Sequence, residues 1–334
     1  MVSIITRQLR VASVVLATSL SLFQTTPAAA AGAVGGFPDK PVSIIVPTTP
    51  GGTADILARL IGPKLAEKWK QPVVVENKPG AGTLIGSEFV ARAKPDGYTL
   101  MLSFNELATL PALNKDVKLN VDSLTRVGQI GSLPVLVLTN PKIESGNLKE
   151  LIALFKANPG KYTYSSNGAG SSLQLFTELF KREAGVDVLH IPYRGALEAS
   201  LAAIAGEVDL LVQFASGNVL NHVKAGKLKA YAVASDKRLA GLPDVPTAAE
   251  AGLPGLRLEA WYGLFAPAGT PDALVQKINK DLNEALALPD IQERLKGINL
   301  QATPSTPADF DRFFRAESER WAALIKAAGI QSNQ

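Results

Sequence analysis

The sequence predicts an α/β protein in which strands of largely parallel sheets alternate with helices. Short apolar or β-branched runs bounded by turn residues recur along the chain, and helical patterns separate them. Several runs are apolar almost throughout, as expected for strands buried on both faces of a parallel sheet. The chain has 334 residues, enough for two domains, so we expect two α/β domains with parallel-rich central sheets around a ligand cleft.

Strand and helix signals follow one another in a regular order. The expected strands span residues 41–47, 72–76, 98–102, 125–130, 134–140, 161–165, 187–192, 208–213, 228–234 and 261–266. Asn147, with Glu150 three residues later, is typical of a capped helix start. The segments 271–288 and 307–329 are rich in helix formers, and each begins with a proline, which is favoured in the first turn.

The first part of the chain, residues 1–31, reads as a signal peptide. Arg7 and Arg10 precede the apolar run 11–23, and small residues typical of a cleavage zone follow. The apolar run is too short to span a bilayer, and no later segment of the sequence is long and apolar enough to do so. We therefore expect export to the periplasm and a soluble mature protein.

Composition excludes several classes of function. The sequence contains no cysteine, which removes disulfides, thiol nucleophiles, thiolate metal sites and lipid anchoring through cysteine. Without Arg7 and Arg10, 32 basic side chains face 30 acidic ones. This near balance argues against nucleic acid as a partner, because a phosphate backbone calls for clustered Lys and Arg. Any anion site must be local.

The loop after the first strand, "VPTTPGGTADILARL", is the first candidate site. It lacks the lysine of a Walker A loop and the spacing of a dinucleotide fingerprint. Gly51 and Gly52 permit close backbone approach, Thr53 is a plausible helix cap, and Asp55 lies in the first turn. The first N–H groups of a helix lack internal partners, so a carboxylate can bind there. Alternatively, Thr53 and Asp55 only cap the helix.

A second loop of this kind follows the expected strand 161–165. Its polar and glycine positions are Ser165, Ser166, Asn167, Gly168, Gly170 and Ser171. It lacks the G-x-S-x-G spacing of a nucleophile elbow, so a hydrolase serine is not indicated, and a flexible polar loop is the alternative. A third loop places Gly80, Gly82 and Thr83 before a helix. Together the loops predict a cleft that offers helix N-termini to a ligand with one or more carboxylates.

Few other side chains suggest chemistry. Arg194 follows the expected strand 187–192, and Arg binds carboxylates through paired hydrogen bonds; a surface or interdomain salt bridge is the alternative. His190 and His222 show no ligand-like spacing, so we interpret both as structural. We expect no catalytic residues, no metal site and no cofactor.

Several segments, in order along the chain, resemble one family. They are "FPDKPVSIIVPTTPGGTADILARL", "QPVVVENKPGAGTLIGSEFVARAKPDGYTLML", "HIPYRG", "VKAGKLKAYAV", "LPDVPTAAEAGLPG" and "WYGLFAPAGTP". The chain resembles the solute-binding receptors of tripartite tricarboxylate transporters, the Bug or TctC-like receptors, over essentially its whole mature length. The resemblance implies a type II periplasmic-binding-protein fold that closes like a Venus flytrap. We expect residues 37–133 plus 262–334 to form one domain and 134–261 the other.

The resemblance also implies which loops hold the ligand. The opening loop and "SSNGAGSS" match the family segments that hold a carboxylate. The family usually has an aromatic residue and a second proline where this chain has Thr48 and Thr49, which indicates a more polar rim. Phe104 and Asn105 are expected to shape the pocket. Gln213 lies near a position where many relatives carry an acidic or amide residue.

The sequence thus predicts a periplasmic receptor without catalytic activity. It would bind a di- or tricarboxylate or an aromatic acid and deliver it, as a monomer, to the permease subunits of a tripartite tricarboxylate transporter. One alternative is a periplasmic hydrolase or lyase that uses Ser171 or His190. Another is a protein that presents its ligand to a membrane sensor kinase.

Overall fold

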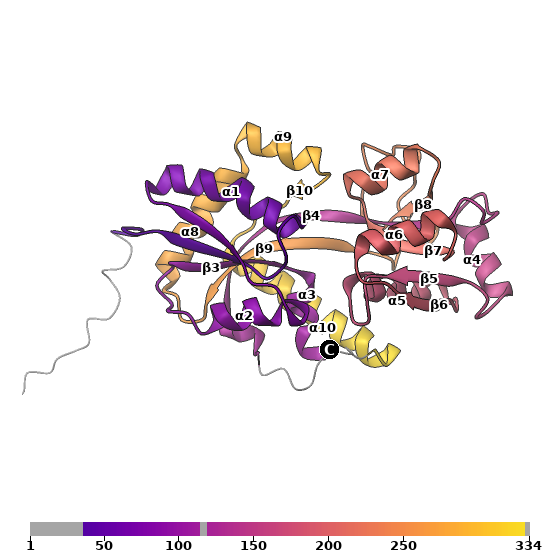
Figure 1. The fold of residues 1–334 in the computed structure, drawn as a ribbon, viewed down its shortest axis with the longest axis horizontal. Helices are drawn as coiled ribbons and strands as arrows, with labels where there is room; N and C mark the ends of the chain where they lie inside the picture. The colour runs from indigo at the N-terminus through magenta and orange to yellow at the C-terminus, as the bar shows by residue number, and fades with distance from the viewer. Residues whose placement is uncertain (1–35, 114–118, 331–334) are drawn as a thin grey trace, which may run out of the picture. The chain divides into compact units, whose positions relative to one another are not determined.

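Helices pack against a mixed, curled β-sheet (Figure 1). The computed structural model describes residues 36–113 and 119–330. The strands are β1 (Val42–Val46), β2 (Val73–Asn77), β3 (Thr99–Phe104), β4 (Leu124–Thr139), β5 (Thr163–Ser166), β6 (Leu189–Pro192), β7 (Leu210–Phe214), β8 (Lys229–Val233), β9 (Glu259–Pro267) and β10 (Gln301–Ala302). The α-helices are α1 (Thr53–Trp69), α2 (Leu84–Ala91), α3 (Asn105–Leu113), α4 (Leu148–Ala157), α5 (Ser172–Ala184), α6 (Ala196–Ala205), α7 (Gly217–Lys224), α8 (Asp272–Leu286), α9 (Pro289–Gly297) and α10 (Pro307–Ala328). Two short 3-10 helices are η1 (Ala81–Thr83) and η2 (Val121–Ser123).

The sheet confirms the predicted α/β class. Its strand order is β2-β1-β3-β9-β4-β7-β5-β6, with β8 and β10 also paired to β4. β1 pairs in parallel with β2 and β3, and β5 pairs in parallel with β6 and β7. All pairings of β4, and that of β3 with β9, are antiparallel. The parallel groups expected in two sheets are therefore joined into one sheet through β9 and β4.

Strand β4 corrects one sequence prediction. Residues 125–130 and 134–140 were expected as separate strands, but one strand of 16 residues covers both. Pro134 is tolerated in it because the partners change there: Pro134 is the last residue opposite β9, and Val135 is the first opposite β7. The Pro134 carbonyl accepts a hydrogen bond from the Ala215 amide. Proline has no N–H to donate, so the hydrogen-bond ladder of β4 is interrupted only where its partner changes from β9 to β7.

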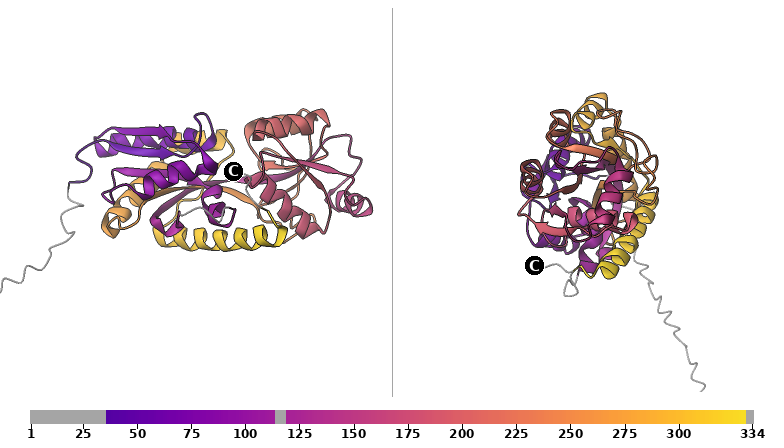
Figure 2. Two further views of the ribbon diagram at one scale, coloured as in Figure 1. Left: turned by 60° about the horizontal axis from the view of Figure 1, so that its bottom comes forward. Right: turned by 90° about the vertical axis from the view of Figure 1, so that its right-hand side faces the viewer.

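Helix α10 packs against elements from both ends of β4 (Figure 2). Near its start, Phe310 and Phe314 lie edge-on to Trp261 of β9, at ring-centroid distances of 5.9 and 5.7 Å. Near its end, Trp321 and Leu324 join the core that surrounds β5 and β7. The 22-residue helix thus contributes to the cores at both ends of β4.

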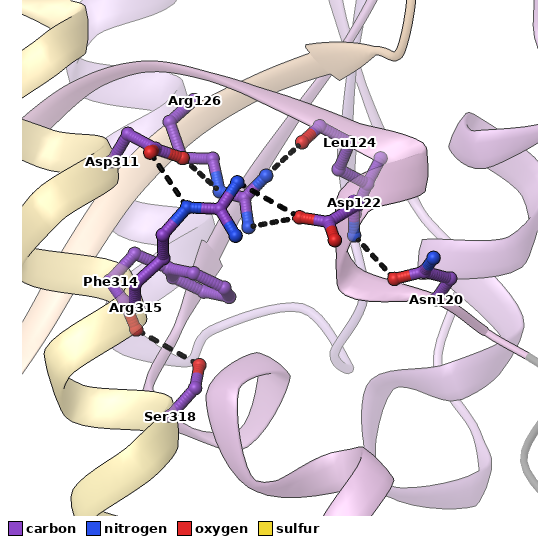
Figure 3. Close-up of polar contacts among 8 residues, drawn as sticks. All are labelled: Asn120, Asp122, Leu124, Arg126, Asp311, Phe314, Arg315 and Ser318. Atoms are coloured by element: carbon purple, nitrogen blue, oxygen red, sulfur yellow. Dashed lines mark hydrogen bonds and ion pairs between the residues drawn. The ribbon is translucent and has the colours of Figure 1, made fainter.

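A buried guanidinium holds the start of α10 to β4 (Figure 3). Arg126 of β4 donates to the Leu124 carbonyl at 2.7 Å and stacks over the Phe314 ring at 4.6 Å. Its charge is balanced by Asp122 at 3.4 Å and by Asp311 of α10 at 3.3 Å. The Arg126 side chain is 5% exposed, whereas those of Asp122 and Asp311 are 52% and 37% exposed, so the guanidinium is the buried member of this cluster.

We predict that Arg126→Ala lowers the free energy of unfolding by about 1.5–3 kcal/mol, because hydrogen bonds to a charged group and the ring contact are lost together. Chemical denaturation measures this change. Arg315→Ala is the matched control: Arg315 pairs with Asp122 and Asp311 but is 53% exposed, so the loss should stay below about 1 kcal/mol. Equal losses in the two variants would contradict the anchoring role of Arg126.

Candidate functional site

A cavity of about 810 Å³ lies among the loops that follow β1, β3, β5 and β7. The loop between β1 and α1, the turn around η1, the start of α3, the loop between β5 and α5, and the starts of α6 and α7 all line it. Loops at the carboxyl ends of strands are where α/β sheets place ligands. The cavity therefore lies where the fold class predicts a binding site.

Most of the predicted site residues line this cavity, and some do not. Those in the lining are Thr48, Thr49, Gly52, Thr53, Phe104, Asn105, Asn167, Gly168, Gly170, Ser171 and Gln213. Those outside it are Gly51, Asp55, Ser165, Ser166 and Arg194. The third predicted loop also contributes, through Gly80, Gly82 and Thr83.

Four helices begin at the cavity with an extended N-cap residue and no side-chain cap. The N-cap residues of α1, α5, α6 and α7 are Gly52, Ser171, Gly195 and Ser216, and none makes a capping hydrogen bond through its side chain. By contrast, Asn147 of α4 and Thr306 of α10 cap helices that lie outside the lining. Helices α8 and α9 are also uncapped but do not line the cavity. Uncapped first turns keep N–H donors and a partial positive charge for a ligand.

Asp55 organises the opening loop from outside the cavity lining. Its buried carboxylate accepts hydrogen bonds from the Gly51 amide at 3.0 Å, from the Arg59 side chain at 3.0 and 3.1 Å, and from Asn77 at 3.0 Å. Arg59 contributes most to a lowered pKa of this carboxyl, and burial works against the shift. Gly51 adopts φ +88°, a conformation that favours glycine. The alternative interpretation of Asp55, as a structural residue of the helix start, fits these contacts.

The second loop bonds largely to itself. The Ser165 hydroxyl donates to the Ala199 carbonyl at 2.9 Å. The Ser166 hydroxyl lies 3.1 Å from the Gly168 amide and 2.6 Å from Nε2 of His190. The Ser171 hydroxyl donates to the Gly168 carbonyl at 2.6 Å. These contacts fix the loop shape. Ser165 and Ser166 are buried beneath the loop and stabilise it from outside the cavity lining.

Three other predicted residues line the cavity with side chains that are already engaged by the protein. The Asn105 side chain pairs with the backbone of β9, donating to the Glu259 carbonyl and accepting from the Trp261 amide. The Gln213 amide donates to the carbonyl of Ala196, the first residue of α6, at 3.3 Å and to the Ser200 hydroxyl at 3.2 Å, and so holds that helix. Phe104 packs against Tyr262 at a ring-centroid distance of 5.9 Å. These side chains set the shape of the cavity.

Four buried oxygens in the lining have no hydrogen-bond partner in the protein. They are Thr48 Oγ1, Thr83 Oγ1, Glu106 Oε2 and Asn167 Oδ1. Buried polar atoms are normally paired, so a group of unpaired ones around one cavity indicates the position of a polar ligand. The three elements that carry Thr48, Thr83 and Asn167 are the three predicted loops.

Among the described lining residues, His222 of α7 is the one side chain with a basic nitrogen. Among them, Glu106 is the one carboxyl group, and there is no Lys or Arg. Arg194 is exposed, and its backbone amide donates to Glu198 at 3.2 Å. It follows β6, an edge strand of the sheet, which leaves it outside the cavity lining.

The sequence prediction missed Glu106 and Tyr262. Glu106 accepts a hydrogen bond from the Ser172 hydroxyl at 2.8 Å, and burial raises the pKa of its carboxyl. Burial also raises the pKa of the Tyr262 phenol, and the Thr53 hydroxyl opposes that shift. Glu106 directly follows Phe104 and Asn105, which the sequence predicts to shape the pocket. Its position just after a strand could therefore have indicated that it belongs to the site.

Comparison with known proteins identifies the chain. The family model described as "Tripartite tricarboxylate transporter family receptor" matches residues 57–330. The chain belongs to this receptor family. It is similar to the periplasmic binding protein BugD, with 34% identity, a TM-score of 0.74, and coverage of 89% of this chain and 100% of that one.

Two similar structures, both from Rhodopseudomonas palustris, include an organic acid. MatC with bound malate is 32% identical, with a TM-score of 0.73 and coverage of 86% of this chain and 100% of that one. Rpa4515 with adipate is 30% identical, with a TM-score of 0.77 and coverage of 89% and 99%. This receptor is accordingly a solute-binding protein rather than an enzyme. In the described ranges, none of the helices combines the length and apolar character needed to cross a membrane; the expected signal peptide, residues 1–31, lies outside those ranges.

The two residues of the hydrolase alternative are not paired in the receptor. Ser171 bonds to a carbonyl in its own loop, whereas His190 contacts Ser166, which is fully buried. The His190 ring stacks on Tyr164 at 4.8 Å. Burial lowers the pKa of His190, with the Lys181 charge acting in the same direction and the Glu178 charge opposing it.

The shifted histidine predicts a pH dependence of stability. Because the folded state disfavours protonated His190, the unfolded chain binds the proton more readily, and the free energy of unfolding should fall as pH drops through about 6.5. His190→Gln should remove this part of the fall, measured by denaturation between about pH 8 and pH 5. Comparison of each profile with its own value at about pH 8 separates this effect from the contacts that the substitution removes. A profile for His190→Gln that parallels wild type would contradict the assignment.

Proposed function

We propose that this receptor captures an organic carboxylate in the periplasm and delivers it to the permease subunits of a tripartite tricarboxylate transporter. Di- and tricarboxylates and aromatic acids are the proposed ligand classes. The observation that carries the proposal is the set of uncapped helix starts around a cavity whose described lining lacks Lys and Arg. Such a lining favours an anion through backbone donors.

The energetics of such a site are sufficient for a receptor. One helix terminus contributes about 0.3–1 kcal/mol to an exposed anion and about 2 kcal/mol in partly buried geometry. Micromolar affinity requires about −8 kcal/mol, so several helix starts and hydroxyls must act together. The cavity brings the starts of α1, α6 and α7 and the unpaired oxygens of Thr48, Thr83 and Asn167 to one place, and the two threonine hydroxyls can also donate; the start of α5 is already bonded to Glu106.

Two further observations support the carboxylate and the closing motion. Malate and adipate, named with the two similar structures, are both organic acids. The proposed division into residues 37–133 plus 262–334 and 134–261 agrees with the change of β4 partners at Pro134 and Val135. We infer that the receptor closes on its ligand by bending β4 and β9 near this point.

A thermal-shift panel tests the ligand class. Di- and tricarboxylates and aromatic acids, each at about 100 times the dissociation constant, should stabilise the folded state by about 2.7 kcal/mol through mass action and raise the melting temperature. Neutral sugars and amines of similar size are the controls and should leave it unchanged. Stabilisation by a sugar or an amine but by no acid would contradict the proposal.

A pair of variants at Thr53 tests the backbone donors. Thr53 is the first residue of α1 and follows extended Gly52 (ψ 165°), so proline fits there. Thr53→Pro and Thr53→Val both lose the hydroxyl, but only proline loses the N–H. We expect Thr53→Pro to bind the acid more weakly than Thr53→Val by about 1.5–3 kcal/mol in calorimetry, the value of a hydrogen bond to a charged group. Equal affinities of the two variants would show that the backbone amide of Thr53 does not bind the ligand.

A further inference from the structure

Glu106, the second residue of α3, places a carboxyl group in the cavity lining. Its Oε1 accepts the hydroxyl of Ser172, the first residue of α5, at 2.8 Å. Its Oε2 is buried and has no partner in the protein. One oxygen of this carboxyl is thus fixed to the helix start, and the other remains available to a ligand.

This contact occupies one of the helix starts that the sequence predicted as an anion site. The Ser172 hydroxyl and amide both favour the charged form of Glu106, although burial outweighs them and raises the pKa of the carboxyl. A ligand carboxylate that approached α5 would therefore meet a carboxyl group already bonded there. Two carboxylates at one site repel each other unless a proton lies between them.

In the cavity lining, His222 of α7 is the one described side chain that can carry a positive charge. No charged side chain from the elements around α3 contributes to the pKa shift of Glu106. The titratable neighbour that interacts with its charge is Tyr262 of β9, a buried phenol whose own pKa is raised. When Glu106 is ionised, the proton that a second carboxylate needs must come from the ligand or from solvent.

We propose that Glu106 determines ligand specificity, because the ligand group that meets its free oxygen must bring a proton to the contact. A hydroxyl or amino group of an organic acid supplies that proton itself. A second carboxylate binds there only with uptake of one proton from solvent, which forms a carboxyl–carboxylate hydrogen bond. This inference rests on the proposed function and names the ligand subclass: acids whose other polar end is a hydrogen-bond donor.

Calorimetry with matched ligands tests the inference. The probes are α,ω-dicarboxylates of four to six carbons and ω-hydroxy acids of the same lengths, measured at about pH 8 and about pH 5. Wild type should bind the hydroxy acids at least about tenfold more tightly at the higher pH, and its affinity for dicarboxylates should rise at the lower pH. Glu106→Gln keeps an acceptor for Ser172 and offers an N–H to a carboxylate. This variant should lose the preference for hydroxy acids and the pH dependence of dicarboxylate affinity.

Two controls separate the possible outcomes. Glu259→Gln changes an exposed carboxylate outside the cavity lining and should behave as wild type, and the melting temperature of unliganded Glu106→Gln checks the fold. Acid binding with the same ranking and pH profile in wild type and Glu106→Gln would overturn the role of Glu106. If no acid binds to either protein, the proposed function itself fails, and that result is distinct from the first.

Discussion

The backbone pairing of β4 is the constraint on which the binding site depends. Its 16 residues, most of them buried, pair with β9 along the first part and with β7 and β8 along the last. Because this strand connects the two groups of parallel strands through its antiparallel pairings with β9 and β7, the loops after β1 and β3 are brought to the same cavity as those after β5 and β7. Arg126 and α10 then hold the flanking helices to this strand.

The resulting cavity has an unusual electrostatic balance for a proposed acid-binding site. Positive potential comes from the N-termini of the helices, and its effect is confined to the first helical turn. Such a site attracts an anion without burying a charged Lys or Arg side chain. Glu106 adds a carboxyl at one of those starts, in a place where burial makes its charged form unfavourable. In the proposed site, attraction for one carboxylate is therefore combined with discrimination against a second, unless that second group brings a proton.

Much of this arrangement could be predicted from the sequence, because local signals specify it. The alternation of strands and helices, the Asn147 cap of α4 and the glycine loops ahead of α1 and α5 all follow from nearest neighbours in the chain. The strands expected at 125–130 and 134–140 are one strand, since Pro134 looks like a break unless the partner strands are known. Which site residues face the cavity depends on packing that no local pattern records. Arg194 was chosen for its chemistry but follows an edge strand, whereas Glu106 was passed over although it contacts α5 across 66 residues of chain.

The most direct test of the account is a crystal structure of the receptor with the acid that stabilises it most. The account predicts a carboxylate of that acid within hydrogen-bond distance of first-turn N–H groups at the cavity, and a hydroxyl, amino or protonated carboxyl group of the ligand at Glu106 Oε2. A ligand carboxylate paired instead with Arg194 or a lysine, away from the helix starts, would contradict it.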